Sequence, residues 1–545
     1  MTTAALPVHA RDHLVGTGKL LRHMLRRDRK RLPGWTLGLA MLMAYFTTAL
    51  RTVLATPEDL AGIAGFAKSP VGALFGGPGH GYDDLTIERF LASQYGLYIM
   101  VGAALMGLLT VTRHTRAEER SGRAELVRAN VVGRRAQLTA ALALAGLMSL
   151  LVAALITGVM TGAGFDAGGA LLFGASVGAA GLTFAGIAAV AVQLSEYPRA
   201  AAGIAGTVLG AAFVLRGLGD MAAVQGSGPS WLSWLSPLGW SQQTAPFVLD
   251  RWWPLAFSVV FAAGAALAGY TLSDRRDLGA ALVPPRTGSA TAAPWLRHPL
   301  AVAFRLQRSS LVGWSLGLLA GGLAYGSFTQ PMIDGFADAP ADLVAVMGGS
   351  EDMLSGFLGL MGLMMAFTVA VFAVLATQSL RGEETDGRAE PVLATAVSRA
   401  GWLGSHVVVT GLGVVWLLFV AGAGMGVGAA VSTGDAGLVG ELILGHVAHA
   451  PAVWLVLAVA ALLYGAVPRA LPAVWVLLGY GILVGFFAPI LDISETAVSV
   501  SPFEHIGEYP LENIAVGAVL ALIAVAGVVL AAALGTFRRR DLTTT

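Results

Sequence analysis

Cysteine is absent from this chain of 545 residues, which excludes structural disulfides and thiolate metal sites. Charge is also scarce. Charged residues make up 12% of the chain, whereas soluble proteins carry about 25%. Hydrophobic residues make up 56%, and the mean hydropathy is +0.71. Long apolar runs separated by short polar stretches indicate a polytopic membrane protein rather than a soluble domain.

Motifs that carry catalysis or cofactor binding are missing as well. The sequence contains no phosphate loop of the G-x-x-x-x-G-K-[ST] type and no H-E-x-x-H motif. We therefore predict no catalytic residue, no bound cofactor and no metal site on this chain, and no nucleic-acid partner. Any chemistry that drives the protein is expected on another subunit.

Ionisable residues are rare within the apolar runs. Arg51, Arg216 and Asp220 lie near the ends of such runs, where long side chains can reach the interface at little cost. A proton-coupled carrier needs a titratable group, usually a carboxylate, within the membrane. The sequence offers no good candidate, which argues against that class.

Twelve apolar stretches are long enough to span a bilayer as helices, since about 20 residues suffice. We therefore predict an all-α membrane protein. The predicted spans are residues 35–53, 93–112, 137–160, 169–193, 200–219 and 254–273 in the first half, and 311–329, 355–378, 403–429, 446–466, 470–490 and 513–534 in the second.

Loop charges predict the orientation of the chain. Eight Lys and Arg residues precede Trp35, and the loop 113–136 holds seven Arg. By contrast, the segments 330–354 and 491–512 are acidic and contain neither Lys nor Arg. Because basic loops stay on the cytoplasmic side, both termini and the loop 113–136 are predicted to be cytoplasmic.

The two halves repeat each other. "GWTLGL" at 34–39 recurs as "GWSLGL" at 313–318, and "RRDL" at 275–278 recurs at 539–542. Six spans are an even number, so the repeats are predicted to be parallel rather than inverted. We assign an N-terminal segment with an interfacial helix at 1–34, a first six-helix half at 35–273, a cytoplasmic linker with a second interfacial helix at 274–310, a second half at 311–534 and a tail at 535–545.

Two charged segments stand out within this apolar chain. The first charged segment, "RAEERSGRAELVRA", covers 116–129, and the second charged segment, "RGEETDGRAEPVLA", covers 381–394. They share nine of fourteen positions, and each follows the second span of its half. Membrane topology alone requires arginine but does not require Glu-Glu and Gly at the same spacing. We therefore favour a docking surface over a merely solvated charged loop.

Read as helices, the two segments have matching ion pairs. Glu119 with Arg123, and Glu384 with Arg388, are spaced i,i+4 in the favoured orientation. Pro391 in the second segment is expected to end its helix earlier, so that the two surfaces differ.

The six-span unit, with a basic interfacial helix before its first span and an E-x-x-x-G-x-x-E segment after its second, resembles the permeases of ABC-2-type exporters. Two fused units resemble the actinobacterial tetronasin and polyketide-antibiotic efflux permeases over the whole chain. The resemblance implies that the charged segments are coupling helices, 116–126 and 381–391, on which two copies of a separate cytosolic ABC ATPase dock with Mg-ATP. The implied docking residues are Arg116, Glu118, Glu119, Gly122, Arg123 and Glu125, with Arg381, Glu383, Glu384, Gly387, Arg388 and Glu390.

The resemblance also implies a substrate path along spans 2 and 5 of each half and a cap over the exit. Methionine and aromatic side chains there suit varied lipophilic ligands. The path candidates are Tyr95, Tyr98, Met106, Phe213, Met361, Met365, Trp475 and Tyr480, and the cap candidates are Trp234, Pro237 and Pro502.

Together these features predict the permease subunit of an ATP-driven exporter in the bacterial cell membrane, which moves hydrophobic compounds outward. Three alternatives stay open: an exporter of lipids or polymer precursors, a proton-coupled carrier of the major facilitator type, and a non-transport sensor. The carrier also has two parallel six-span repeats, but its typical motif after the second span, G-x-x-x-D-R-x-G-R-R, is absent.

Overall fold

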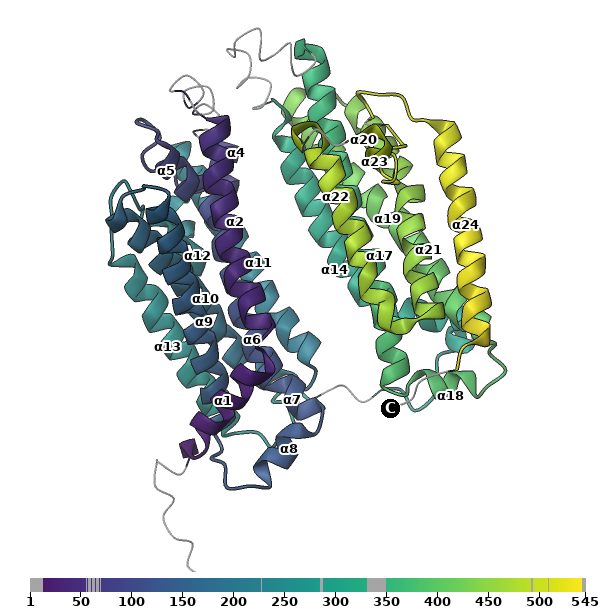
Figure 1. The fold of residues 1–545 in the computed structure, drawn as a ribbon, viewed down its shortest axis with the longest axis horizontal. Coiled ribbons are helices and arrows are strands. Elements are labelled where there is room, and N and C mark those ends of the chain that lie inside the picture. The colour runs from purple at the N-terminus through teal and green to yellow at the C-terminus, as the bar shows by residue number, and fades with distance from the viewer. Residues whose placement is uncertain are drawn as a thin grey trace, which may run out of the picture. The chain divides into compact units, whose positions relative to one another are not determined.

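The computed structural model describes residues 13–541, apart from residues 55, 57–59, 61–63, 65–67, 69, 227, 285–287, 331–348, 492–493 and 508. The chain divides into two compact units, Met1–Gly288 (unit 1) and Ser289–Thr545 (unit 2). Their boundary falls inside the predicted linker. The ordered secondary structure of the described residues is entirely helical (Figure 1).

Unit 1 contains six long helices and several short ones. The long helices are α2 (Arg31–Val53), α6 (Gly96–His114), α9 (Ala136–Gly162), α10 (Ala167–Leu194), α11 (Pro198–Val224) and α13 (Pro254–Ser273). The short ones are α1 (Thr17–Arg27), α4 (Pro70–Phe75), α5 (Ile87–Phe90), η2 (Leu91–Tyr95), α7 (Arg116–Arg120), α8 (Arg123–Arg128), η3 (Ser230–Leu235) and α12 (Pro237–Gln242). Within unit 1, α1, α7 and α8 lie at one end of the bundle, opposite α4, α5 and α12 (Figure 1).

Unit 2 is built in the same way. Its helices are η4 (Pro294–Arg297), α14 (Pro299–Ser327), α17 (Gly349–Thr385), α18 (Ala389–Leu393), α19 (Arg399–Thr433), α20 (Gly437–Ala448), α21 (Ala450–Ala466), η5 (Pro468–Ala473), α22 (Val474–Leu491), α23 (Glu495–Val498) and α24 (Val516–Arg539). Within unit 2, α18 lies near one end of the bundle and α23 near the other (Figure 1).

Helices occur at all twelve predicted spans, and ten of the described helices are long and apolar enough to cross a membrane. The other two positions are α2 and the membrane part of α14, whose glycine, serine, threonine and tryptophan residues lower their hydropathy. The chain is therefore a multi-pass helical membrane protein.

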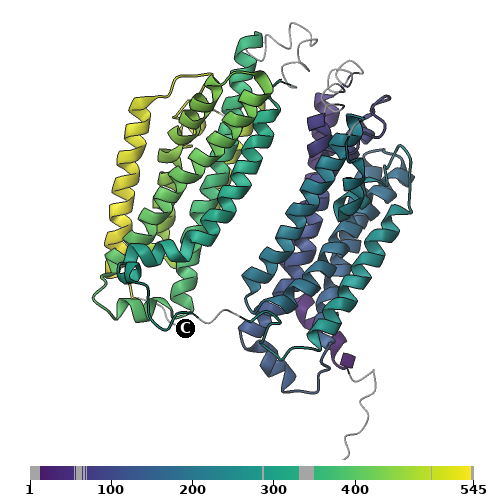
Figure 2. The same ribbon diagram turned by 180° about the vertical axis from the view of Figure 1, so that it is seen from behind.

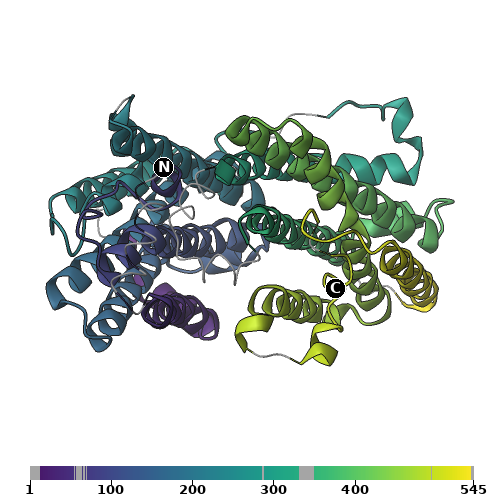
Figure 3. The ribbon, with the colours of Figure 1, turned by 90° about the horizontal axis from the view of Figure 1, so that it is seen from above.

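In unit 1, α10 lies at the centre and packs against α6, α9, α11 and α13. In unit 2, α14 lies along α19 (Figure 2), and α21 along α24. The α14–α19 contact is close because Gly322 and Gly326 face helix backbone; an added Cβ at Gly326 would lie 2.0 Å from the carbonyl oxygen of Met425. Within each unit the long helices run side by side, so Figure 3 views many of them nearly end-on.

One expectation about the second half is wrong. The segment before span 7 was predicted to form a separate interfacial helix, but α14 runs without a break from Pro299 to Ser327. Pro299 lies in the first turn, where a missing N–H costs nothing, and no later residue interrupts the helix. In unit 1 a separate helix, α1, ends at Arg27 before α2 begins, and its place in the membrane interface stays a prediction.

Candidate functional site: the repeated charged segments

The first charged segment forms two short helices rather than one. Helix α7 ends at Arg120, Gly122 adopts the left-handed conformation with φ 73°, and α8 begins at Arg123. In the second charged segment α17 continues to Thr385, Gly387 has φ 70°, and α18 begins at Ala389. Glycine recurs because other residues adopt this backbone conformation only at a cost.

Three predictions about the segments are therefore corrected. A single helix over 116–126 or 381–391 does not form, because the chain turns at the glycine. The predicted i,i+4 ion pairs are replaced by pairs that span the turn. Arg388 donates to Glu383 at 2.9 and 2.8 Å, and Arg123 lies 3.8 Å from Glu118.

Pro391 does not shorten its helix. Helix α18 ends at Leu393, the counterpart of Arg128 at the end of α8. Pro391 is the third residue of α18, within the first turn, where the backbone N–H has no partner in the helix. Proline is therefore tolerated at this position.

Glu119 is buried at the centre of a polar cluster. Its side chain is 5% exposed and accepts two hydrogen bonds from the Arg276 guanidinium, at 2.8 and 2.9 Å. Arg116 donates a third, at 2.8 Å, and also donates to the carbonyl oxygen of Val192. The Nε atom of Arg276 donates to Gln193, 2.5 Å away, so the cluster joins α7 to the ends of α10 and α13.

Glu384 is bound in the same way in unit 2. Its side chain is 3% exposed and accepts two hydrogen bonds from the Arg540 guanidinium, at 2.9 and 2.7 Å. The hydroxyl of Tyr464 donates a third, at 2.7 Å. Arg276 and Arg540 occupy the same position in the two copies of "RRDL". We call these two arrangements the Glu119 clamp and the Glu384 clamp.

A second arginine supports each clamp. Arg134 donates to the carbonyl oxygens of Asp274 and Arg276, at 2.9 and 3.0 Å. Its counterpart Arg399 donates to the carbonyl oxygen of Arg540. These contacts fix the segment that follows α13 or α24 and satisfy carbonyls that a helix end leaves free.

Helix α1 is bound to the first charged segment. Arg27 is paired with Glu118, and Asp28 accepts from Arg113 at 3.1 Å and from His114 at 2.8 Å. Burial alone would raise the pKa of the Asp28 carboxyl, but the hydrogen bonds and charges of His114 and Arg113 outweigh it and hold the pKa below its usual range. The end of α1 is thus fixed to the end of α6.

The tips of the two charged segments are exposed and differ in character. In the first, Leu126 is 73% exposed and Val131 is 88% exposed. Their counterparts by position are Pro391 and Ala396, which are also exposed but smaller. Glu125 and Glu390 are exposed in both tips. The exposed surface of each charged segment therefore lies at its tip, whereas Glu119 and Glu384 lie beneath it.

At the opposite end of unit 1, Arg216 and Asp220 contradict the sequence interpretation. They are 0% and 1% exposed rather than at the interface, and they form an ion pair at 3.2 Å. Arg216 also donates to Gln242 and to the carbonyl oxygen of Gly76, both at 3.1 Å, and Ser233 donates to Asp220. Helices α4, η3 and α12 cover the pair, and no local sequence pattern indicates that they would.

The predicted cap residues lie at the end of each unit opposite its charged segment. Pro237 is buried at the start of α12, and Trp234 stacks on Trp253 with 5.2 Å between ring centroids. In unit 2, Pro502 is buried in a turn. The ring of the neighbouring Phe503 packs against Phe367, with 4.3 Å between the ring centroids. Their role in closing an exit stays a prediction.

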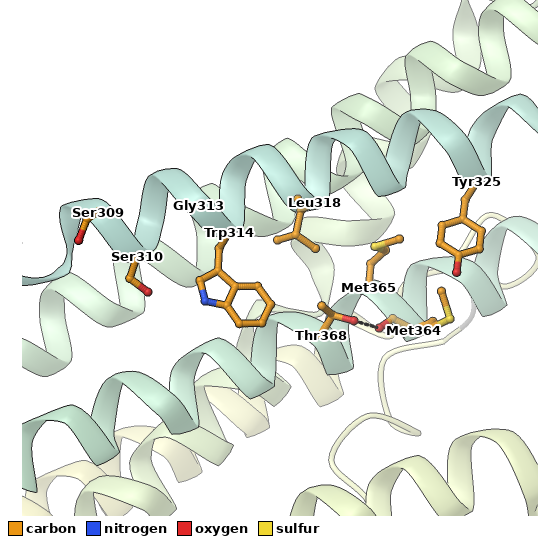
Figure 4. Close-up of a pocket in the computed structure, with 10 residues that line it drawn as sticks. Ser309, Ser310, Gly313, Trp314, Leu318, Tyr325, Met364, Met365 and Thr368 are labelled. Atoms are coloured by element: carbon orange, nitrogen blue, oxygen red, sulfur yellow. Dashed lines mark hydrogen bonds between the residues drawn. The ribbon is translucent and has the colours of Figure 1, made fainter. Parts of the chain in front are cut away.

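An open cavity of about 590 Å³ lies on the surface of unit 2 between α14 and α17 (Figure 4). None of its ten lining residues is charged. They are Ser309, Ser310, Gly313, Trp314, Gly317, Leu318, Tyr325, Met364, Met365 and Thr368. A Cβ added to Gly313 or Gly317 would meet nothing within 4 Å, so the glycines widen the space.

Among the predicted path residues, Met365 lines this cavity. Met106 is enclosed in the core of unit 1, Met361 packs beside α20, and the Tyr480 hydroxyl donates to the carbonyl oxygen of Ala497 at 2.6 Å. Tyr98 is 46% exposed, and Trp475 is 36% exposed. The ring centroids of Tyr95 and Phe46 lie 4.7 Å apart with their planes tilted by 47°, and the ring of Phe213 lies beneath Arg216. No single space among the described residues unites these side chains.

Sequence reasoning missed the arginines of both clamps. Arg276 and Arg540 lie 157 and 156 residues beyond their glutamates, outside the reach of any local pattern. The recurrence of "RRDL" was a usable signal, because the two motifs follow the last helix of each half. Trp314 and Tyr325 were missed because span 7 was not considered as part of a path.

Comparison with known proteins places this geometry in a family. The family model described as "Multidrug efflux system permease Rv1217c, C-terminal domain" matches residues 21–272 and 296–538, one segment in each unit. The multidrug efflux system permease protein Rv1217c of Mycobacterium tuberculosis (strain ATCC 25618 / H37Rv) is 37% identical over 543 residues, which cover 98% of this chain and 96% of that protein. The chain belongs to the family of multidrug efflux permeases that Rv1217c represents.

Proposed function

We propose that this chain is the permease subunit of an ATP-binding-cassette exporter of the ABC-2 type, with twelve spanning helices in two parallel repeats and both termini in the cytoplasm. A separate ATPase, present in two copies and carrying Mg-ATP, supplies the energy. The relative Rv1217c is named as a permease of a multidrug efflux system, which supports efflux of drug-like compounds.

The observation that carries the proposal is the paired construction of the charged segments. Each is fixed to its own bundle by a buried glutamate, and each presents an exposed tip beyond a left-handed glycine. A surface that is rigidly held and built twice suits two copies of one partner. The chain has no nucleotide-binding motif of its own, so the partner would hold the ATP.

The cavity between α14 and α17 supports a lipophilic, uncharged or weakly polar substrate. Trp314 and Tyr325 offer aromatic faces, Met364 and Met365 offer adaptable thioethers, and Ser309 offers a hydroxyl. Pockets for small molecules usually measure about 300–1,000 Å³ and are mostly apolar with a few polar groups. This lining matches that description and has no charge to select an ionic substrate.

A proton-coupled drug carrier is the competing function, and Asp220 is the observation in its favour. The sequence interpretation relied on the absence of a membrane carboxylate, and Asp220 is buried. However, Arg216 compensates its charge, and the pair binds the outer segments of unit 1 rather than lining the described cavity. We therefore favour the ATP-driven exporter.

Co-purification and energy inhibitors test the proposal in whole cells. The permease should retain an ABC ATPase encoded beside it, and efflux of a lipophilic fluorescent dye should stop with vanadate and continue with an uncoupler. Efflux that continues with vanadate and stops with the uncoupler would favour the proton-coupled carrier over the ATP-driven exporter. An exporter of lipids or polymer precursors would retain the ATPase but leave dye efflux at the background of cells without the permease.

A further inference from the structure

The Glu119 and Glu384 clamps repeat a long-range contact that no docking role explains. In each unit one guanidinium donates to both oxygens of a buried carboxylate. The four hydrogen bonds of the two units measure between 2.7 and 2.9 Å. Bidentate pairs of this kind fix orientation as well as distance. Since both carboxylates are almost inaccessible, they are poorly placed to touch another protein.

Each clamp joins the same three parts of its unit. In unit 1, Arg116 reaches the last turn of α10 through Val192, and Arg276 reaches it through Gln193, just after α13. In unit 2, Tyr464 belongs to the last turns of α21, and Arg540 directly follows α24. The charged segment, the fourth helical span and the sixth helical span of each unit are therefore linked at one end.

The arginine supports make these links stiff. Arg134 donates to the backbone carbonyl oxygen of Arg276, and Arg399 donates to that of Arg540. Moving a charged segment without its sixth helix would separate a buried carboxylate from its guanidinium. Breaking such a pair is costly because it leaves an unpaired charge in a site that water does not solvate.

We infer that the two clamps are rigid levers that pass a displacement of each charged segment to the fourth and sixth spanning helices of the same unit. Glu119, Arg276, Glu384 and Arg540 are thus positioning residues for transport rather than contacts for the partner. The inference rests on the proposed function, because the displacement is taken to come from the ATPase docked on the tips.

The levers predict a separation of docking from transport. In the complex of permease and ATPase, Glu384→Gln should lower dye efflux about ten-fold, within the range of typical coupling between sites. The amount of ATPase retained should stay within about two-fold, so more ATP is hydrolysed per dye molecule moved. Glu441→Gln, an exposed change on α20 outside the charged segments, should alter neither quantity. The exchanged pair Glu384→Arg with Arg540→Glu should recover part of the efflux.

Cysteine pairs provide a second test that does not depend on the fold of Glu384→Gln. The chain has no native cysteine, so only introduced thiols react. Glu384→Cys with Arg540→Cys should lose efflux and regain it when a short bifunctional thiol reagent joins the two positions. The lever would be overturned if efflux stays absent after crosslinking, or if crosslinking stops efflux in a pair that transports before it. Glu384→Gln with the same efflux per ATP hydrolysed as wild type would also overturn it.

Failure of the proposed function looks different in the same experiments. The wild-type chain would then retain no ATPase, and its efflux would resist vanadate before any clamp residue is changed. A different result would overturn the lever alone. If wild-type efflux is normal and sensitive to vanadate but Glu384→Gln no longer retains the ATPase, the glutamate has a docking role.

Discussion

Individual residues in the charged segments divide into buried and exposed groups. Glu119 with Glu384, and Ala124 with Ala389, are enclosed in their units. Glu125 is exposed in the tip. Much of the repetition in the sequence thus preserves a turn and its anchorage. Under the proposed function, recognition of the ATPase is expected to depend on the exposed minority of positions.

The glycine turns lead to a prediction about stability. Gly122→Ala and Gly387→Ala should each destabilise the protein by about 1 kcal/mol, because alanine in a left-handed conformation is strained. Space is not limiting, since an added Cβ meets nothing within 4 Å at either site. Thermal unfolding of the purified protein in detergent measures the change. Gly34→Ala, inside α2 and equally open, is the control and should be neutral or slightly stabilising; equal losses at all three sites would contradict this explanation.

Asp28 leads to a prediction about pH. The hydrogen bonds of His114 and Arg113 hold the pKa of Asp28 below its ordinary value of 3.8, so its contribution to stability is present above that value and is lost as pH falls through the folded-state pKa. Asp28→Asn should therefore lower stability by about 2 kcal/mol at neutral pH. The difference in the free energy of unfolding between Asp28→Asn and wild type should become smaller under acid conditions. Unfolding followed as a function of pH checks this, with exposed Glu125→Gln as control. A gap that persists unchanged in acid would show that the carboxylate charge is not responsible.

At the scale of elements, apolar run length located ten described helices that are long and apolar enough to cross a membrane, because such a helix must keep about 20 apolar residues in the bilayer. The predicted span 254–273 coincides with α13, and 169–193 lies within α10. Local patterns failed where distant parts meet. The break at Gly122 depends on backbone conformation, the Glu119 clamp on a residue after α13, and the burial of Asp220 on the loops that cover it.

The exposed tips lead to a prediction about docking. Leu126→Ala should weaken binding of the ATPase about ten-fold, since a large apolar side chain that becomes buried at an interface is a typical hot spot. Pro391→Ala, at the matching position of the second tip, should change the affinity less than about two-fold, because less apolar area is removed. Titration of the ATPase against permease in nanodiscs measures both. Equal effects would mean that the two tips are equivalent.

The cavity leads to a prediction about substrates. Gly317→Leu places a side chain in the space between α14 and α17 and should reduce efflux of bulky lipophilic dyes about ten-fold while leaving ATPase retention intact. Gly38→Leu, the counterpart in "GWTLGL" on α2, is the matched control and should have less effect. The ratio of efflux rates for a large and a small dye is the measurement. An unchanged ratio in Gly317→Leu would remove this cavity from the substrate path.

At the scale of the whole molecule, the two units share their anchorage and differ in their outer and apolar features. Both have a clamp, a supporting arginine and a left-handed glycine. The buried Arg216–Asp220 pair belongs to unit 1, and its counterpart region in the second half has no such residues in sequence. We expect that the ATPase moves both units in the same way, and that the two units contact the substrate differently.

The central claim is that ATP hydrolysis on a partner, transmitted through the charged segments, drives export. The most direct measurement uses proteoliposomes that contain only the purified permease and its ATPase, with no ion gradient across the membrane. The proposal predicts that Mg-ATP on the side of the charged segments drives a lipophilic dye across, and that vanadate abolishes this transport. Transport by the permease alone, driven by an imposed pH gradient and indifferent to ATP, would contradict the claim.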